Sequence, residues 1–107
     1  MNVADAALRG GSPQVALQVV TGVLNSDPNN TQALLIQGDA LTLLGRNDAA
    51  ATSFERVLTR SPSSDRAQLG LGRLRLGSNP AEAEKLFLNV LQKNPNDTAA
   101  LNNLGIA

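Results

Sequence analysis

Small and apolar residues recur along the chain three and four positions apart, in stretches separated by glycine and proline. After Gly45, for example, Ala50, Phe54 and Val57 stand four and three residues apart. Because a helix turns once in 3.6 residues, this spacing places the three side chains on one face. The pattern therefore predicts an amphipathic helix that buries this face against another element.

The same pattern occurs three times along the chain. Each copy opens with a glycine and closes with a proline, and the closing prolines Pro28, Pro62 and Pro95 recur at nearly equal intervals. A regular repeat of this kind indicates a stack of similar supersecondary units. Equivalent positions hold similar side chains: Gly11, Gly45 and Gly77; Ala16, Ala50 and Ala83; Val20, Phe54 and Phe87; and Val23, Val57 and Val90.

A second helical pattern begins at Thr31, again at Asp65, and again at Thr98, and each time it contains a glycine seven residues later. Each unit is therefore expected to be a pair of antiparallel helices. The chain is predicted to be one all-α domain of about seven helices, with units at residues 1–30, 31–64, 65–97 and a partial unit at 98–107.

Capping residues agree with these boundaries. Asn79 is expected to be an N-cap, followed by Pro80 and by Glu82 at the third helical position. Ser12 followed by proline repeats this start without the glutamate. The glycine that opens each copy suits the left-handed conformation that follows a helix.

The arrangement resembles the tetratricopeptide repeat, which has small residues at positions 8 and 20, a large apolar residue at 24, a small apolar one at 27 and proline at 32. The matching residues in the second unit are Gly38, Ala50, Phe54, Val57 and Pro62, and in the third Gly72, Ala83, Phe87, Val90 and Pro95. The resemblance implies a right-handed superhelical stack, or α-solenoid. A Sel1-like repeat fits less well because its period is longer.

The third unit departs from this pattern. Position 4 holds Leu34 in the second unit and Gln68 in the third, and position 11 holds Leu41 and then Arg75. These departures leave the register of residues 65–76 open by one residue.

A narrower resemblance concerns residues 96–107. They are similar to a segment of the repeat lipoproteins of bacterial Flp (tight-adherence) pilus assembly, the TadD type. This resemblance implies a scaffold in pilus assembly and a periplasmic location at the outer membrane. Without it, a cytoplasmic location is the alternative.

Composition argues against several classes of function. The chain has nine basic and nine acidic residues, no histidine and no cysteine. A balanced charge disfavours a nucleic-acid partner, and the missing side chains remove thiol chemistry and the usual zinc ligands. Glu82 and Glu84 are two residues apart and point to different sides of a helix, so they do not form an acid–base pair. We therefore expect no enzyme activity, no cofactor, no metal and no membrane contact.

In the tetratricopeptide family the first helix of each pair lines a concave groove. Positions 2, 5, 9, 12 and 13 of each unit are implied to face a protein or peptide partner there. These positions are Asp5, Leu8 and Arg9; Gln32, Leu35, Asp39, Thr42 and Leu43; Arg66, Leu69, Arg73, Leu76 and Gly77; and Asn102 and Ile106.

Structural roles are the alternative for several of these residues. The leucines of this set, Leu35, Leu43, Leu69 and Leu76, could pack between helices. Asp39 and Arg73 could form an ordinary surface ion pair. Family members that hold acidic C-terminal peptides of heat-shock proteins use lysine and asparagine at fixed groove positions. This chain has no groove lysine and has Asp39 where an asparagine could stand, which argues against such a ligand.

The sequence therefore predicts a protein-interaction scaffold. A spacer or self-associating segment, and an accessory domain of a larger enzyme, are the alternatives. The last apolar residues, Leu101, Leu104 and Ile106, have no following helix to cover them. We therefore expect a fragment of a longer protein whose apolar ends could drive self-association.

Overall fold

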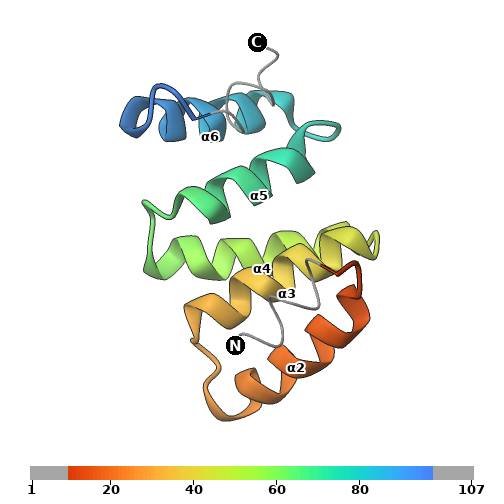
Figure 1. Ribbon diagram of the computed structural model, residues 1–107. Coiled ribbons are helices and arrows are strands. Elements are labelled where there is room, and N and C mark those ends of the chain that lie inside the picture. Colours follow the sequence, from red (N-terminus) through yellow and green to blue (C-terminus); the bar gives the residue numbers. More distant parts are fainter. Residues whose placement is uncertain (1–9, 98–107) are drawn as a thin grey trace.

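The computed structural model describes residues 10–97, which form five helices and no strand. The helices stack in chain order, and consecutive helices run in opposite directions (Figure 1). This confirms the all-α prediction and agrees with a solenoid. The described residues thus hold five helices and not the expected seven; the expectations for residues 1–9 and 98–107 lie outside the described part. The five helices are α2 (Pro13–Ser26), α3 (Thr31–Leu43), α4 (Asn47–Arg60), α5 (Asp65–Arg75) and α6 (Pro80–Lys93).

The interior consists of clusters between neighbouring helices. Phe54 and Phe87 are fully buried, at 1% and 0% exposed, as the repeat pattern predicts. The equivalent alanines Ala16, Ala50 and Ala83 are each 0% exposed, since helices approach closely at these positions. The repeated positions therefore form the contacts that hold the stack together.

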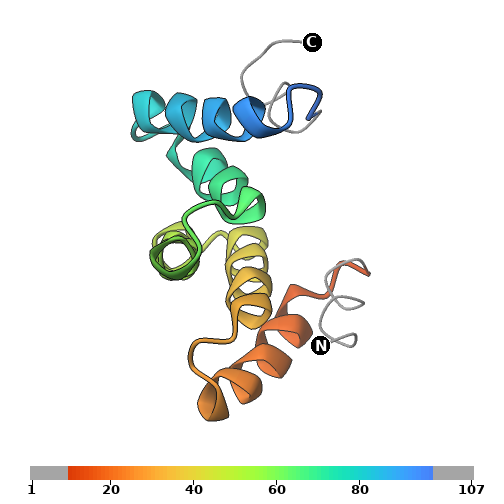
Figure 2. The same cartoon turned by 90° about the vertical axis from the view of Figure 1, so that its left-hand side faces the viewer.

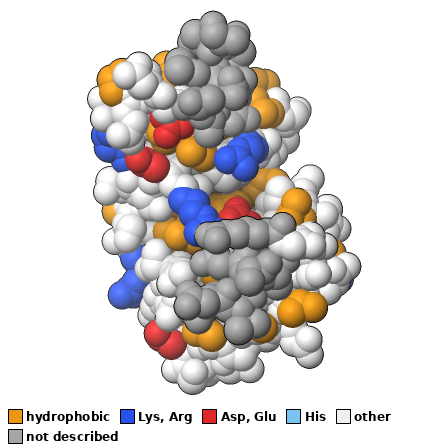
Figure 3. Space-filling model, in the orientation of Figure 1, with side chains coloured by type: hydrophobic (Ala, Val, Ile, Leu, Met, Phe, Trp, Pro, Cys, Tyr) orange, Lys and Arg blue, Asp and Glu red, His pale blue; other side chains and the backbone are white. Residues whose placement is uncertain are grey.

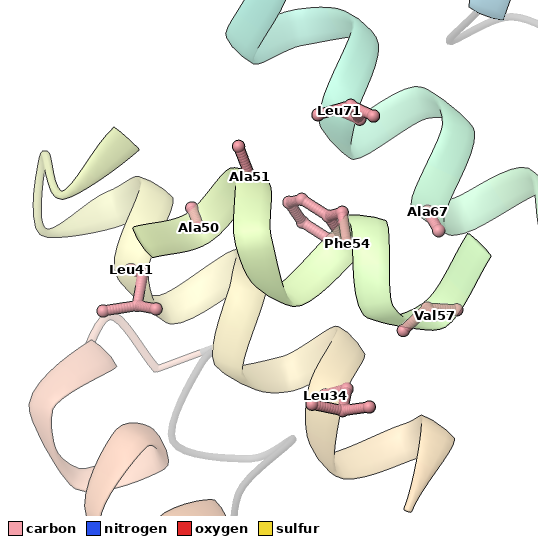
Figure 4. Close-up of a cluster of buried hydrophobic side chains, with 8 residues drawn as sticks. All are labelled: Leu34, Leu41, Ala50, Ala51, Phe54, Val57, Ala67 and Leu71. Carbon is pink, nitrogen blue, oxygen red and sulfur yellow. The ribbon is translucent and has the colours of Figure 1, made fainter. Parts of the chain in front are cut away.

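Phe54 of α4 packs against the helices on both sides of it. A Cβ atom at Gly38 of α3 would lie 2.7 Å from its ring, and one at Gly70 of α5 would lie 2.5 Å away. Figure 4 shows the ring on α4 between α3 and α5, near Leu71. The two glycines therefore make room for one aromatic side chain between three helices.

Phe87 of α6 repeats half of this arrangement. A Cβ at Gly72 would lie 2.6 Å from its ring, as at Gly38 against Phe54. Gly38 and Gly72 thus occupy equivalent positions in consecutive units. This fixes the register of α5, because every residue of α5 then matches the residue one repeat earlier in α3.

The turns between units repeat as well. The N–H groups of Asn30 and Ser64 donate to the carbonyls of Asp27 and Ser61, at 3.1 and 3.0 Å. The side chains of Asn30 and Ser64 then accept from the third helical N–H, at 2.9 and 3.3 Å. Both residues are therefore N-caps of a first helix.

Of the five predicted capping positions, three are confirmed and two are wrong. Asn79 caps α6 by accepting from the Glu82 N–H at 3.3 Å, and Gly11 and Gly45 have φ of 78° and 77°. Gly77 does not have a positive φ: α5 ends at Arg75, and residues 76–79 join it to α6, a connection one residue longer than residues 44–46 between α3 and α4. Ser12 makes no side-chain cap, although Pro13 begins α2 as expected.

Candidate functional site

The first helices of the two described pairs, α3 and α5, contact each other directly. In Figure 2 they lie on one side of the stack, and α4 lies on the other. We use the name α3–α5 face for the surface formed by residues 32, 35, 39, 42 and 43 of α3, residues 66 and 73 of α5, and residue 76, which follows the last residue of α5. Most of the predicted partner-binding residues within the described chain belong to it.

An ion pair joins the two helices on this face. Nη2 and Nε of Arg66 donate to Oδ2 of Asp39 at 2.5 and 3.2 Å. The side chains are 44% and 32% exposed, so the pair lies at the surface. The alternative in which Asp39 forms a surface ion pair with Arg73 is therefore wrong, because Asp39 is bound to Arg66 on the neighbouring helix instead.

Arg73 lies seven residues after Arg66, two helical turns along the same stripe of α5. It is exposed, and it has no ion pair or hydrogen bond from its side chain within residues 10–97. Among the described residues, the α3–α5 face therefore offers one guanidinium that is already held by a carboxylate and one that is available to a ligand.

Two leucines stand exposed at the C-terminal ends of the same helices. Leu43 is 63% exposed and Leu76 is 44% exposed, so the packing alternative does not describe them. Single exposed leucines are common, but these two stand at the ends of the first helices of consecutive units, and Arg73 is one helical turn before Leu76. Figure 3 shows hydrophobic, cationic and anionic side chains close together across the middle of this view.

Other predicted residues have structural roles. Leu69 is only 9% exposed and belongs to the cluster of Ala83, Phe87 and Val90. Its expected exposure to a partner is therefore wrong, since position 5 of this unit faces the next helix. Leu35 is half-buried against the central cluster.

The polar members of the set differ in availability. The Thr42 hydroxyl donates to the Gly38 carbonyl at 2.8 Å, so its hydrogen is already used. Gln32 and Gly77 are exposed. The remaining predicted residues, Asp5, Leu8, Arg9, Asn102 and Ile106, lie outside the described part of the chain.

A second polar cluster, which was not predicted, joins α5 to α6, the two helices of the third unit. Lys93 of α6 lies 2.5 Å from Oδ1 of Asp65 and donates to the Ser63 carbonyl at 2.5 Å. Asn94 donates to the other oxygen of Asp65 at 2.7 Å. These contacts tie the end of α6 to the start of α5. Helical periodicity could not reveal them, because they join residues that are far apart in the sequence.

Two family models match the chain. A tetratricopeptide repeat model matches residues 3–65, which is more than half of the chain, and a second tetratricopeptide repeat model matches residues 41–104. The chain belongs to the tetratricopeptide repeat family. The α3–α5 face is thus the surface formed by the first helices of two consecutive tetratricopeptide units.

Among curated proteins, the chain is similar to the human and mouse proteins called FK506-binding protein-like. Each is 34% identical over 73 residues, which is 68% of this chain. The chain spans 21% of the length of these relatives.

Solved tetratricopeptide structures have the same fold. The first tetratricopeptide domain of human RPAP3 has a TM-score of 0.85 at 22% identity, covering 94% of this chain and 80% of that one. The first such domain of Spaghetti (RPAP3), bound to the HSP90 peptide SRMEEVD, has a TM-score of 0.85 at 22% identity, covering 94% and 81%. A tetratricopeptide protein from Parabacteroides merdae has a TM-score of 0.84 at 25% identity, covering 98% of this chain and 41% of that one.

The tetratricopeptide fold is generally a non-enzymatic scaffold for protein interaction. Within residues 10–97, no three acidic, cysteine or histidine side chains gather as a metal site would require. No helix in the same range is long and apolar enough to cross a bilayer.

Proposed function

We propose that this chain is a protein-interaction module that binds a short peptide or helix of a partner on its α3–α5 face. The proposal rests on one observation: Leu43, Leu76 and Arg73 are exposed on or at the ends of the first helices of two consecutive units, and the Arg73 side chain has no partner within residues 10–97. Apolar side chains of a ligand would cover the leucines, and a carboxylate of the ligand would pair with the guanidinium.

Energetics favour this surface over the outer faces of the second helices. Val15 on α2 and Leu88 on α6 are also exposed, at 47% and 43%, but α2 and α6 lie at opposite ends of the described stack (Figure 1). The α3–α5 face instead combines two large apolar side chains with a cation. Aliphatic anchors next to an orienting charge are what a short peptide needs for both affinity and direction.

Solved neighbours support peptide binding as a function of this fold. RPAP3 domains are solved with the HSP90 peptide SRMEEVD and the HSP70 peptide SGPTIEEVD. Both peptides end in several acidic residues. The ligand proposed for this chain is different, because the α3–α5 face combines two exposed leucines with Arg73 alone as the available cation among the described residues.

Peptide selection from a random library tests the proposal. Peptides that the wild-type chain enriches are measured by isothermal titration against the triple variant Leu43→Ser, Leu76→Ser, Arg73→Gln. Loss of two apolar contacts and one ion pair is expected to weaken binding at least about tenfold, which corresponds to about 1.4 kcal/mol. The matched control is Val15→Ser with Leu88→Ser, which changes two equally exposed apolar residues outside the face.

Circular dichroism and thermal unfolding establish that both variants fold. We expect the control to bind like the wild type. The proposal is wrong if the selected peptides bind the triple variant as tightly as the wild type, or if the control variant loses binding instead.

A role in pilus assembly is a separate and narrower hypothesis. It rests on the resemblance of residues 96–107 to the TadD type, and all but Asn96 and Asp97 of that segment lie outside the described part. Binding of the chain to purified components of an Flp pilus system would test it.

A further inference from the structure

The charges of the α3–α5 face are arranged unevenly. Asp39 is the only charged residue of α3, and α2 has none. Asp39 and Arg73 occupy the same position in consecutive units and have opposite charges. The face therefore has a carboxylate on one helix where the next helix has a guanidinium.

Asp39 also determines how much positive charge the face can offer. Both Arg66 contacts converge on its Oδ2, so the guanidinium of Arg66 is neutralised by a neighbour that is itself partly buried. Any carboxylate that approaches Arg66 must compete with Asp39 and is repelled by it. Arg73 has no such competitor within residues 10–97, so a single ligand carboxylate can bind there.

We infer that Asp39 is a specificity residue that limits the α3–α5 face to peptides with one acidic residue beside apolar ones, and that it excludes peptides with clustered acids. This inference rests on the proposed function. It adds that discrimination comes from a repulsive element, the carboxylate that already holds Arg66. The partner is thus expected to present leucine-like side chains and one glutamate or aspartate.

The test uses four synthetic peptides with amidated C-termini. They share the same leucines and differ only in having no, one, two or three adjacent glutamates in place of glutamines. Fluorescence anisotropy at about 0.05 M salt gives their affinities, because surface charge effects are strongest at low ionic strength. For the wild-type chain, the first glutamate is expected to strengthen binding about fivefold, and the second and third to weaken it again because Asp39 repels them.

The decisive variant is Asp39→Asn, which keeps the size of the side chain and removes its charge. Arg66 then becomes available, and we expect the peptide with three glutamates to bind about tenfold more tightly than to the wild type. Adding Arg66→Gln to this variant is expected to abolish the gain. The matched control is Asp65→Asn, which removes the same charge from a carboxylate held by Lys93 instead.

The outcomes separate the inference from the proposed function. Equal affinities of the three-glutamate peptide for the wild type and Asp39→Asn overturn the inference, as does an equal gain in Asp65→Asn, which would mean that only net charge matters. If none of the four peptides binds the wild type or any variant, both the inference about Asp39 and the proposed binding face are wrong. Binding that depends on Leu43 and Leu76 but not on Asp39 leaves the function in place and removes only the specificity role.

Discussion

The two complete helix pairs of the described chain, α3 with α4 and α5 with α6, share an interior and differ on their surface. Both place a glycine of the first helix against a phenylalanine of the second, Gly38 against Phe54 and Gly72 against Phe87. On the α3–α5 face, however, one pair contributes a carboxylate and the other a guanidinium. Positions that set the packing are therefore filled alike, while positions that face a ligand are free to differ.

The pairs also differ where one unit meets the next. Val20 of α2 shares a cluster with Ile36 of α3, whereas the equivalent Phe54 of α4 meets Gly70 of α5. At the α2–α3 contact the smaller side chain is on the second helix of one unit and the larger one is on the first helix of the next. At the α4–α5 contact the sizes are reversed. At each interface a larger side chain on one helix is accommodated by a smaller one on the other.

Exchanging the large and small side chains of Phe54 and Gly70, which meet at the α4–α5 contact, is expected to have the largest effect on the free energy of unfolding. Phe54→Val alone opens a cavity and should lower the free energy of unfolding by about 2–4 kcal/mol. Gly70→Ile alone should be at least as damaging, because even its Cβ would lie 2.5 Å from the Phe54 ring.

The double variant reproduces the side chains of the α2–α3 contact. It should recover about 1–3 kcal/mol relative to the sum of the single effects. Urea unfolding of the four proteins measures this coupling. Strictly additive losses would contradict the size-matching explanation.

A single methyl group at Gly70 should have a smaller but clear effect. Gly70→Ala puts a Cβ within 2.8 Å of three ring atoms of Phe54, and overpacking of this kind costs about 1–3 kcal/mol. Gly22→Ala is the matched control, since Gly22 is also helical but has no neighbouring atom within 4 Å of the added Cβ.

We expect Gly22→Ala to stabilise the chain by about 0.5–1 kcal/mol, because alanine is the better helix former. Thermal unfolding should therefore shift in opposite directions for the two variants. A stabilised Gly70→Ala protein would show that the close approach at Phe54 does not exist.

Removing a helix cap should cause the smallest change in the free energy of unfolding. Asn30→Ala removes a hydrogen bond of 2.9 Å to the start of α3, and Ser64→Ala removes a longer one of 3.3 Å at α5. Each is expected to cost about 1 kcal/mol or less, with Asn30 the more costly. Ser12→Ala is the control, because Ser12 makes no side-chain cap. A loss in Ser12→Ala as large as in Asn30→Ala, measured by chemical denaturation, would contradict this assignment.

The interior was predictable because it repeats. The alignment of Gly38 with Gly72 and of Phe54 with Phe87 follows from the spacing of residues, and the structure places both pairs in contact. Gly77 broke the pattern because α5 ends earlier in its unit than α3 does, which leaves Gly77 inside a longer turn. Local spacing also assigned the cap at Asn79, since all the atoms involved lie within one turn.

The surface was predictable only in part. Periodicity places Leu69, Arg73 and Leu76 on nearby parts of α5, but it does not show that Leu69 is covered by α6. The partner of Asp39 could not be read either, because Arg66 belongs to the next unit and lies on another helix. The sequence does not show how far one first helix is shifted along its axis relative to the next. This shift brings position 9 of one unit beside position 2 of the next.

Backbone amide NMR of the ¹⁵N-labelled chain, titrated with a peptide selected on the wild-type protein, tests the central claim most directly. Binding on the α3–α5 face predicts the largest shift changes around Leu43, Arg73 and Leu76, and small changes along the exposed side of α4. Changes concentrated on the outer sides of α2, α4 or α6, with those three residues unaffected, would contradict the claim.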